Sequence, residues 1–226
     1  MRDQNELECY NDYLYSSDRH LFLDYHNEAR LRVASGVEPN GYDEMLPPAA
    51  NMYKLRWSCV LENEMQERLS KCATEIPPLK GFGQNVMTIY DHKGTLLAPL
   101  KEIRETLRDW WGELELNEVS GSTISYTTED LHNFANMVFA DNTEIGCSYA
   151  SCDDDEFVLI GSQYSFSLVQ GRDLSQGKDY DEVVQYENTE QKTPHSRIGI
   201  VEVIEAKTSP ELYDTAISRW SPFHVA

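Results

Sequence analysis

The feature that most constrains the fold is a stripe of apolar residues between positions 96 and 114. Its members lie three or four residues apart: Leu96, Leu100, Ile103, Leu107, Trp110 and Leu114. Charged residues such as Lys101 and Glu105 fill the positions between them. This spacing predicts an amphipathic helix, and such a helix has to bury its apolar face against other elements. The chain must therefore build a packed core around it.

Two segments before the stripe also have helical spacing. The first, from Arg19 to Ser35, is followed by Gly36, a typical helix stop. The second runs from Ala49 to about Lys71, and only Glu62 interrupts its apolar face. Residues 38–48, between the two, are rich in Pro, Asn and Gly, so we predict a loop there.

A short helix and then strands are predicted after the stripe. Leu131–Val138 has helical spacing, and Thr128 or Asp130 can cap it. From residue 144 onwards the sequence becomes rich in β-prone residues, and the runs 144–151 and 157–160 predict a hairpin.

The acidic run 153–156 separates the two predicted strands. A calcium loop needs oxygen ligands at spaced positions, so we expect four adjacent acids to form a solvated hairpin tip instead. Residues 198–204 are a last strand candidate. Helices mostly precede strands and no Gly/Ser-rich linker divides the chain, which favours one mixed α+β domain.

Charge excludes several classes of partner. The chain has 19 basic and 39 acidic residues, a formal net charge of −20. Nucleic acids and anionic membranes are bound through excess Lys and Arg, so we expect neither as a partner. No stretch approaches the roughly 20 apolar residues of a membrane span. The first six residues lack an apolar signal core, so the protein is either cytosolic or has lost a signal peptide.

The reactive residue types form no recognisable catalytic or metal motif. The five cysteines are Cys9, Cys59, Cys72, Cys147 and Cys152. Their spacing does not match zinc knuckles, and an odd number leaves one thiol unpaired, or paired to another chain, if the others are bridged. The six histidines, for which we expect structural or surface roles, are His20, His26, His92, His132, His195 and His224. No nucleophile elbow, P-loop or dinucleotide fingerprint occurs.

Three local strings are more informative. Residues 22–30 read FLDYHNEAR, residues 48–72 begin PAANMYKLRWSCVLE, and residues 133–139 read NFANMVF, followed by TEIGC at 143–147. In order and spacing they resemble the CAP superfamily, which includes cysteine-rich secretory proteins, antigen 5 and plant pathogenesis-related proteins. The likeness spans about residues 10–160. It is greatest to the nematode venom-allergen-like (activation-associated secreted) proteins, and N-F-A-N resembles their hookworm neutrophil-inhibitor branch.

The resemblance implies a single-domain α-β-α sandwich, secretion and disulfides. We accordingly divide the chain into an N-terminal segment (1–18), a CAP core (19–165) and a diverged C-terminal part of the same domain (166–226). All five cysteines are disulfide candidates. The family's second signature has no match around residues 158–164. We therefore expect Cys152 to lack the partner that this signature would supply, and the sequence does not fix the connectivity.

The family's central cavity presents two His and two Glu, which can hold a divalent cation. On the matching positions this chain has Gln84 and Asn133, and only Glu113 keeps the family's residue type. His132 lies one residue before the signature position and is expected to point about 100° away. Gln84, Glu113 and Asn133 are therefore predicted to line a remnant cavity with no metal, no cofactor and no catalysis. The alternative is an alignment shifted by one residue, with His132 or His92 swinging in.

The resemblance implies two non-enzymatic activities. One is binding of sterols or fatty acids in an apolar pocket, with which the stripe 96–114 and the loop 38–48 are compatible, although no lipid-binding residue can be named. The other is binding of a host protein, since an acidic surface can engage a basic partner. We expect a secreted, extracellular, non-enzymatic protein that binds lipid and modulates host immunity. The alternative is a host-protein antagonist without a lipid function.

Overall fold

The computed structural model describes residues 7–40, 44–49, 52–90, 99–117, 119, 124–126, 128–152, 157–168 and 174. In chain order its elements are α1 (Ser16–Ala34), β1 (Arg56–Trp57), α2 (Cys59–Leu69), β2 (Gly83–Tyr90), α3 (Leu100–Leu116), the 3-10 helix η1 (Glu129–Leu131), α4 (His132–Val138), β3 (Glu144–Cys152) and β4 (Phe157–Tyr164).

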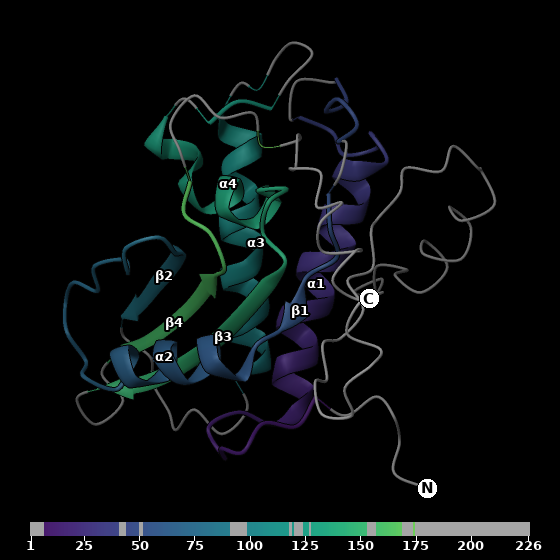
Figure 1. Ribbon diagram of the computed structural model, residues 1–226. Helices are drawn as coiled ribbons and strands as arrows, with labels where there is room; N and C mark the ends of the chain where they lie inside the picture. The colour runs from purple at the N-terminus through teal and green to yellow at the C-terminus, as the bar shows by residue number, and fades with distance from the viewer. Residues whose placement is uncertain are drawn as a thin grey trace, which may run out of the picture.

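The four strands form one sheet, in the order β1-β3-β4-β2. β1 runs parallel to β3, and the β3–β4 and β2–β4 pairs are antiparallel. Helix α2 crosses one face of the sheet, α1 and α4 lie against the other face, and α3 packs on α1 and α4 (Figure 1). A large apolar core fills the second interface and a smaller one lies under α2. This arrangement confirms the predicted α+β sandwich.

Helix α1 confirms the first predicted helix and starts three residues earlier, at Ser16. It ends as the sequence predicts. Gly36 adopts a left-handed conformation with φ +65°. The Gly36 amide donates to the Val33 carbonyl and the Val37 amide to that of Arg32, which satisfies carbonyls left without a partner at the helix end.

The second predicted helix begins ten residues too early, since it was predicted from Ala49 and α2 starts at Cys59. Residues 52–57 are extended, and α2 begins only after Ser58, whose side chain accepts a hydrogen bond from the Leu61 amide. Polar residues of α1 hold the extended segment. The Asn27 side chain exchanges two hydrogen bonds with the Leu55 backbone, at 2.7 and 3.0 Å. The fully buried Arg30 donates to the Tyr53 carbonyl. These tertiary bonds override the local helical spacing.

The third and fourth predicted helices are confirmed. The described part of the long stripe is α3, whose residues Ile103, Leu107 and Trp110 are buried. The short helix α4 follows η1, and the Thr128 side chain caps η1 by accepting from the Asp130 amide.

The hairpin is confirmed as β3 and β4, although β4 continues four residues beyond the prediction to Tyr164. Strand β2 was not predicted. The β-prone residues Val86, Thr88 and Tyr90 occupy every second position of this run, and this spacing is a signal for a strand.

Glycines let α2 approach the sheet closely. A Cβ at Gly146 would overlap the backbone of Leu61 and Glu62, and one at Gly161 would lie 2.6 Å from the Met65 sulfur. These strand positions therefore require glycine because a helix backbone or side chain occupies the space of a side chain.

Four of the five cysteines form disulfides, Cys9–Cys59 and Cys72–Cys152. The expectation that Cys152 lacks a partner is therefore wrong, because its partner comes from the end of α2 and not from the missing signature. Cys147 is a free thiol, so its candidacy for a disulfide is also wrong. It is fully buried beside Ser162, with 3.0 Å between the sulfur and the hydroxyl oxygen. Burial raises its pKa well above the ordinary value.

Several predictions lie outside the described residues. They concern the acidic run 153–156, the strand 198–204, and Leu96, His92, His195 and His224. The division at residues 18 and 165 stays a prediction, although Leu174 is buried and its backbone bonds those of Ile124 and Ala140. In the part of the chain that the structure describes, no helix is long and apolar enough to cross a membrane.

Candidate functional site

Two of the three predicted cavity residues meet where α3 packs against α4. The Asn133 side chain donates to one carboxylate oxygen of Glu113 at 2.6 Å. The other oxygen accepts the backbone amide of Phe134 at 2.9 Å. Phe134 lies in the first turn of α4, where amides have no partner within the helix. Glu113 thus caps α4 from a neighbouring helix.

The electrostatics of Glu113 reflect this role. Partial burial raises the pKa of its carboxyl group, and the hydrogen bonds from Phe134 and Asn133, together with nearby His132, oppose the rise. Both oxygens already accept short hydrogen bonds. The carboxylate is therefore committed to holding α4.

The third predicted residue, Gln84, points the other way. Its side-chain nitrogen donates to the Ile76 carbonyl at 2.7 Å and its oxygen accepts from Arg68, a residue of α2. The next residue, Asn85, faces α4 instead and donates to the Asn133 carbonyl at 3.0 Å. Successive side chains of a strand point to opposite faces of its sheet, so the side chain of Gln84 cannot share the α4 face with that of Asn85. The structure brings Glu113 and Asn133 together but not the Gln84 side chain.

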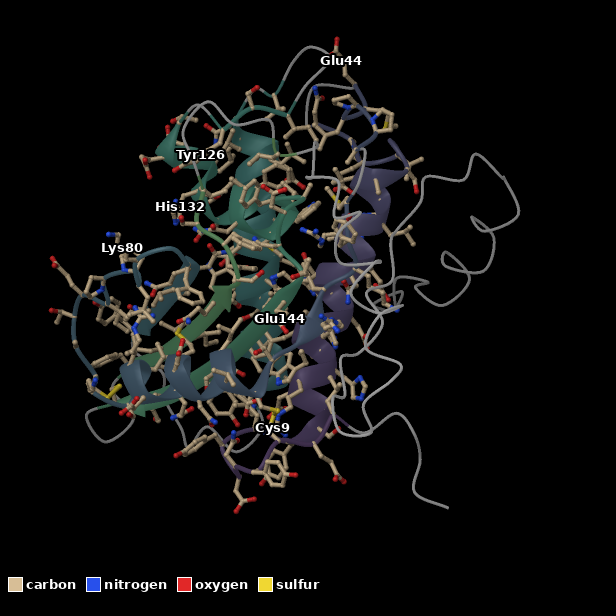
Figure 2. All side chains as sticks on the ribbon, viewed as in Figure 1. Cys9, Glu44, Lys80, Tyr126, His132 and Glu144 are labelled. Carbon is tan, nitrogen blue, oxygen red and sulfur yellow. A yellow bond between two sulfur atoms is a disulfide. The ribbon has the colours of Figure 1, made fainter. Side chains whose placement is uncertain are left out.

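His132 is fixed beside the strand rather than toward Glu113. Its Nε2 donates to the Gln84 backbone carbonyl at 3.1 Å, and its Nδ1 lies 3.2 Å from the Tyr126 hydroxyl. Figure 2 shows the two labelled side chains near each other at the edge of the molecule. Burial raises the pKa of Tyr126 to about 12, and Glu129 adds to the rise.

A buried hydrogen-bond network of polar side chains, which was not predicted from the sequence, runs beside these residues. The Asn136 amide donates to Asn85, and the Asn85 amide donates to the Tyr164 hydroxyl. Tyr164 in turn lies 2.9 Å from Nε2 of His26, whose Nδ1 donates to the Phe22 carbonyl. This tautomer makes Tyr164 the donor to His26. The signal was available, since His26 and Asn136 both occur in the strings that resemble the CAP superfamily.

Neither His26 nor Tyr164, the two titratable groups of this hydrogen-bond network, titrates near neutral pH. Complete burial lowers the pKa of His26 to about 4, to which neighbouring Arg30 contributes. Burial also raises the pKa of Tyr164 well above its ordinary value. General acid–base catalysis works best when the pKa of the group is close to the working pH. The hydrogen-bond network therefore holds the helices and the sheet together and is poorly suited to moving protons.

The donor set does not fit a divalent cation. Among the described residues, no group of three or more His, Cys, Asp or Glu side chains is placed to hold a metal ion. Glu113 uses both oxygens internally, and the Gln84 oxygen accepts from a guanidinium, which would repel a cation. The absence of a metal stays a prediction, which this geometry supports.

With the sandwich and the Glu113–Asn133 pair established, the chain can be compared with known proteins. The sequence model of the cysteine-rich secretory protein family, CAP, matches residues 23–166. The chain belongs to the CAP family. It is similar to the Ancylostoma secreted protein of Ancylostoma caninum, at 39% identity over 144 residues, covering 64% of this chain and 33% of that protein. Venom allergen 5 of Vespula vidua is 27% identical, with 64% and 70% covered.

Solved structures agree with this CAP assignment. Na-ASP-1 superimposes with a TM-score of 0.65 at 28% identity, covering 87% of this chain and 53% of that one. BmVAL-1 gives a TM-score of 0.70 at 23% identity, covering 76% and 88%, and shows the same fold. The resemblance to nematode venom-allergen-like proteins is thus confirmed. The chain spans only about a third of the Ancylostoma protein and half of Na-ASP-1.

Proposed function

We propose that this CAP protein is secreted, acts by binding and not by catalysis, takes sterols or fatty acids, and modulates host immunity. The observation that carries the proposal is the state of Glu113, the cavity carboxylate, whose two oxygens are consumed in capping α4. Secretion is supported by the two disulfides, which persist in oxidising compartments, and by the name of the Ancylostoma relative.

The non-enzymatic part of the proposal follows from the site. Gln84 and Asn133 stand where the family has a carboxylate and an imidazole, and amides neither take up nor release protons near neutral pH. NaASP2, a protein of the same fold at 22% identity, was solved with Zn²⁺. We infer that this chain does not share that ion, since Glu113 is its one charged donor among the matched positions.

The lipid part of the proposal points to the end of α3. Most of the apolar stripe on this helix is packed into the core and is not open to a ligand. Beyond it, the loop around Asn40 is tied to the segment after α3 by a hydrogen bond from the Asn40 side chain to the Val119 carbonyl, at 3.1 Å. Two exposed apolar side chains lie on these joined segments, Met45 (62% exposed) and Leu116 (81% exposed). An apolar rim of this kind supports lipid entry there.

Direct binding of labelled cholesterol and labelled palmitate, with zinc chelated and unlabelled competitor in excess, tests this function. We expect saturable binding that the Leu116→Asp variant weakens at least about tenfold, since it puts a charge on the apolar rim. The matched control is Val60→Asp, which places the same charge on an exposed position of α2. Absence of saturable binding for both lipids would reject the lipid function.

The second candidate function is binding of a host protein without any lipid. A specific observation favours it: the residues before α1 form an ordered segment that exposes three tyrosine rings. Aromatic side chains on a fixed backbone are typical of protein-binding surfaces. Loss of lipid binding together with retained binding to a protein partner would select this alternative.

A further inference from the structure

Residues 7–15, which we call the tyrosine segment, precede α1 and are held firmly although they contain no helix or strand. The Cys9–Cys59 disulfide ties the segment to the start of α2. The Asn11 amide donates to the Asn63 side chain at 2.7 Å, and Leu14 is buried in the main core. A covalent link, a polar contact and an apolar anchor thus fix its backbone at three points.

A buried ion pair between Arg19 and Glu62 also contacts the tyrosine segment. Arg19 donates to both oxygens of Glu62, at 2.7 and 2.8 Å, and both side chains are almost completely buried. Arg19 also donates to the Asn11 side chain at 3.0 Å. Trp57 donates to Glu62 at 2.7 Å and completes the cluster. The one charged interruption of the second predicted helix is therefore an anchor for this segment.

The segment turns its aromatic rings outward. Tyr10 is fully exposed, Tyr15 is 71% exposed and Tyr13 is 54% exposed. The described contacts bind the backbone: the Tyr13 amide donates to the Asn11 side chain and the Tyr15 amide to Asp18. Rings that are exposed on a rigid backbone lose little conformational entropy when a partner covers them.

The charged side chains within the tyrosine segment have one sign. Glu8 and Asp12 are exposed within the segment, and no Lys or Arg occurs between residues 7 and 18. The next basic residue along the chain, Arg19, is buried in its pair with Glu62. Tyrosine faces attract arginine and lysine through cation–π contacts, and carboxylates attract the same cations. A second copy of this chain, with net charge −20, would be repelled.

We propose that the tyrosine segment is a docking surface for a protein partner that presents arginine or lysine side chains beside apolar groups. This inference rests on the second candidate function and names the chemistry of its partner. It concerns a different part of the molecule from the lipid rim. Figure 2 shows Cys9 and Glu44, on the loop joined to the end of α3, at opposite ends of the molecule.

The test uses a defined probe, a synthetic decapeptide that alternates arginine with leucine, and its twin with citrulline in place of arginine. Binding to the purified full chain is followed by fluorescence anisotropy of the labelled peptide. We expect saturable binding of the arginine peptide that the triple variant Tyr10→Ala/Tyr13→Ala/Tyr15→Ala weakens at least about tenfold. The triple variant keeps the net charge, so a loss localises the contact. Tyr90→Ala, at another tyrosine with 69% exposure, is the matched control and should change binding less than about twofold.

Three results would overturn the proposal: equal binding of the citrulline peptide, equal loss in the Tyr90→Ala variant, or unchanged binding by the triple variant. If the triple variant does not fold, Tyr10→Ala alone carries the test, since its ring is the most exposed. Self-association of the wild type that the triple variant abolishes would assign the surface to a second copy and reject the proposal. Cholesterol and palmitate binding is measured on the same variants, so failure of the lipid function is recorded separately.

Discussion

Stability should fall with acid through one residue, His26, which is fully buried in α1 and neutral in the folded protein. Its Nδ1 donates to the Phe22 carbonyl and its Nε2 accepts from Tyr164. Burial lowers its pKa to about 4, and among the described residues the buried Arg30 also acts on it and favours the neutral ring as well. A proton on Nε2 would remove the bond from Tyr164 and place two cations together in the core.

The sign and size of the effect follow from proton linkage. In the unfolded chain an ordinary histidine binds a proton as the pH falls below about 6.5. In the folded protein His26 does so only below about pH 4. Its contribution to stability is therefore complete above about pH 6.5 and is lost as the pH falls from there to about 4. Between about pH 7.5 and about pH 4.5 the loss is about 2 to 3 kcal/mol.

The assay is urea unfolding of the wild type and of His26→Gln across this pH range at constant ionic strength. Glutamine can donate to Phe22 and accept from Tyr164 but does not titrate, so the difference in unfolding free energy isolates the histidine. We expect that difference to shrink by about 2 to 3 kcal/mol from neutral to acid pH. The control variant His20→Gln, at a surface position of the same helix, should follow the wild type. A His26 difference that stays constant with pH would refute the reasoning.

Three further changes have defined outcomes. Glu113→Gln should lower stability by about 1 kcal/mol, because it weakens the cap on α4, and should leave weak zinc binding by calorimetry unchanged; a clear drop in zinc affinity would reveal a metal site. Gly112→Ala in α3 should raise the thermal midpoint, since no atom lies within 4 Å of the new Cβ and alanine favours helix by about 1 kcal/mol, whereas Gly146→Ala should lower it sharply because α2 occupies that space. Replacing Cys72 and Cys152 by serine should cost up to about 4 kcal/mol of unfolding free energy, because the disulfide closes an 80-residue separation, and a loss under about 1 kcal/mol would contradict this.

Local pattern was sufficient wherever the core itself imposes the period. The stripe of α3 buries Ile103, Leu107 and Trp110, and strand β4 is buried at every position from Val158 to Tyr164. In both cases each residue's own neighbours in the chain carry the signal. The same holds for the end of α1, where Gly36 adopts the left-handed conformation that favours glycine.

Where long-range polar contacts fix the backbone, the local spacing of apolar residues predicted the wrong secondary structure. Met52 and Leu55 are spaced like one face of a helix and are buried, yet the backbone there is extended because Asn27 and Arg30 bind it. The Cys72–Cys152 disulfide closes an 80-residue separation, which no spacing rule predicts. The positions of these partners exist only once α1, α2 and the sheet have been assembled.

The candidate site shows the same division. Matching to the family string placed Glu113 and Asn133 correctly as neighbours, since both follow from helix positions. It could not show that the Gln84 side chain bonds Arg68 of α2, because that depends on which face of β2 each residue occupies. Since β2 was not predicted as a strand, its alternation was not available.

The contacts of Glu113 explain how the geometry between α3 and α4 can be held without a bound cation. A partly buried carboxylate requires hydrogen-bond donors or cations as partners, and leaving one unpaired is costly. Here the amide of Asn133 and the Phe134 amide at the start of α4 supply them, so the geometry between α3 and α4 is maintained by hydrogen bonds alone. A site held in this way has no donor to offer a ligand without exposing an amide of α4. Recognition by this CAP protein is therefore best sought on its surface, at the end of α3 and at the tyrosine segment.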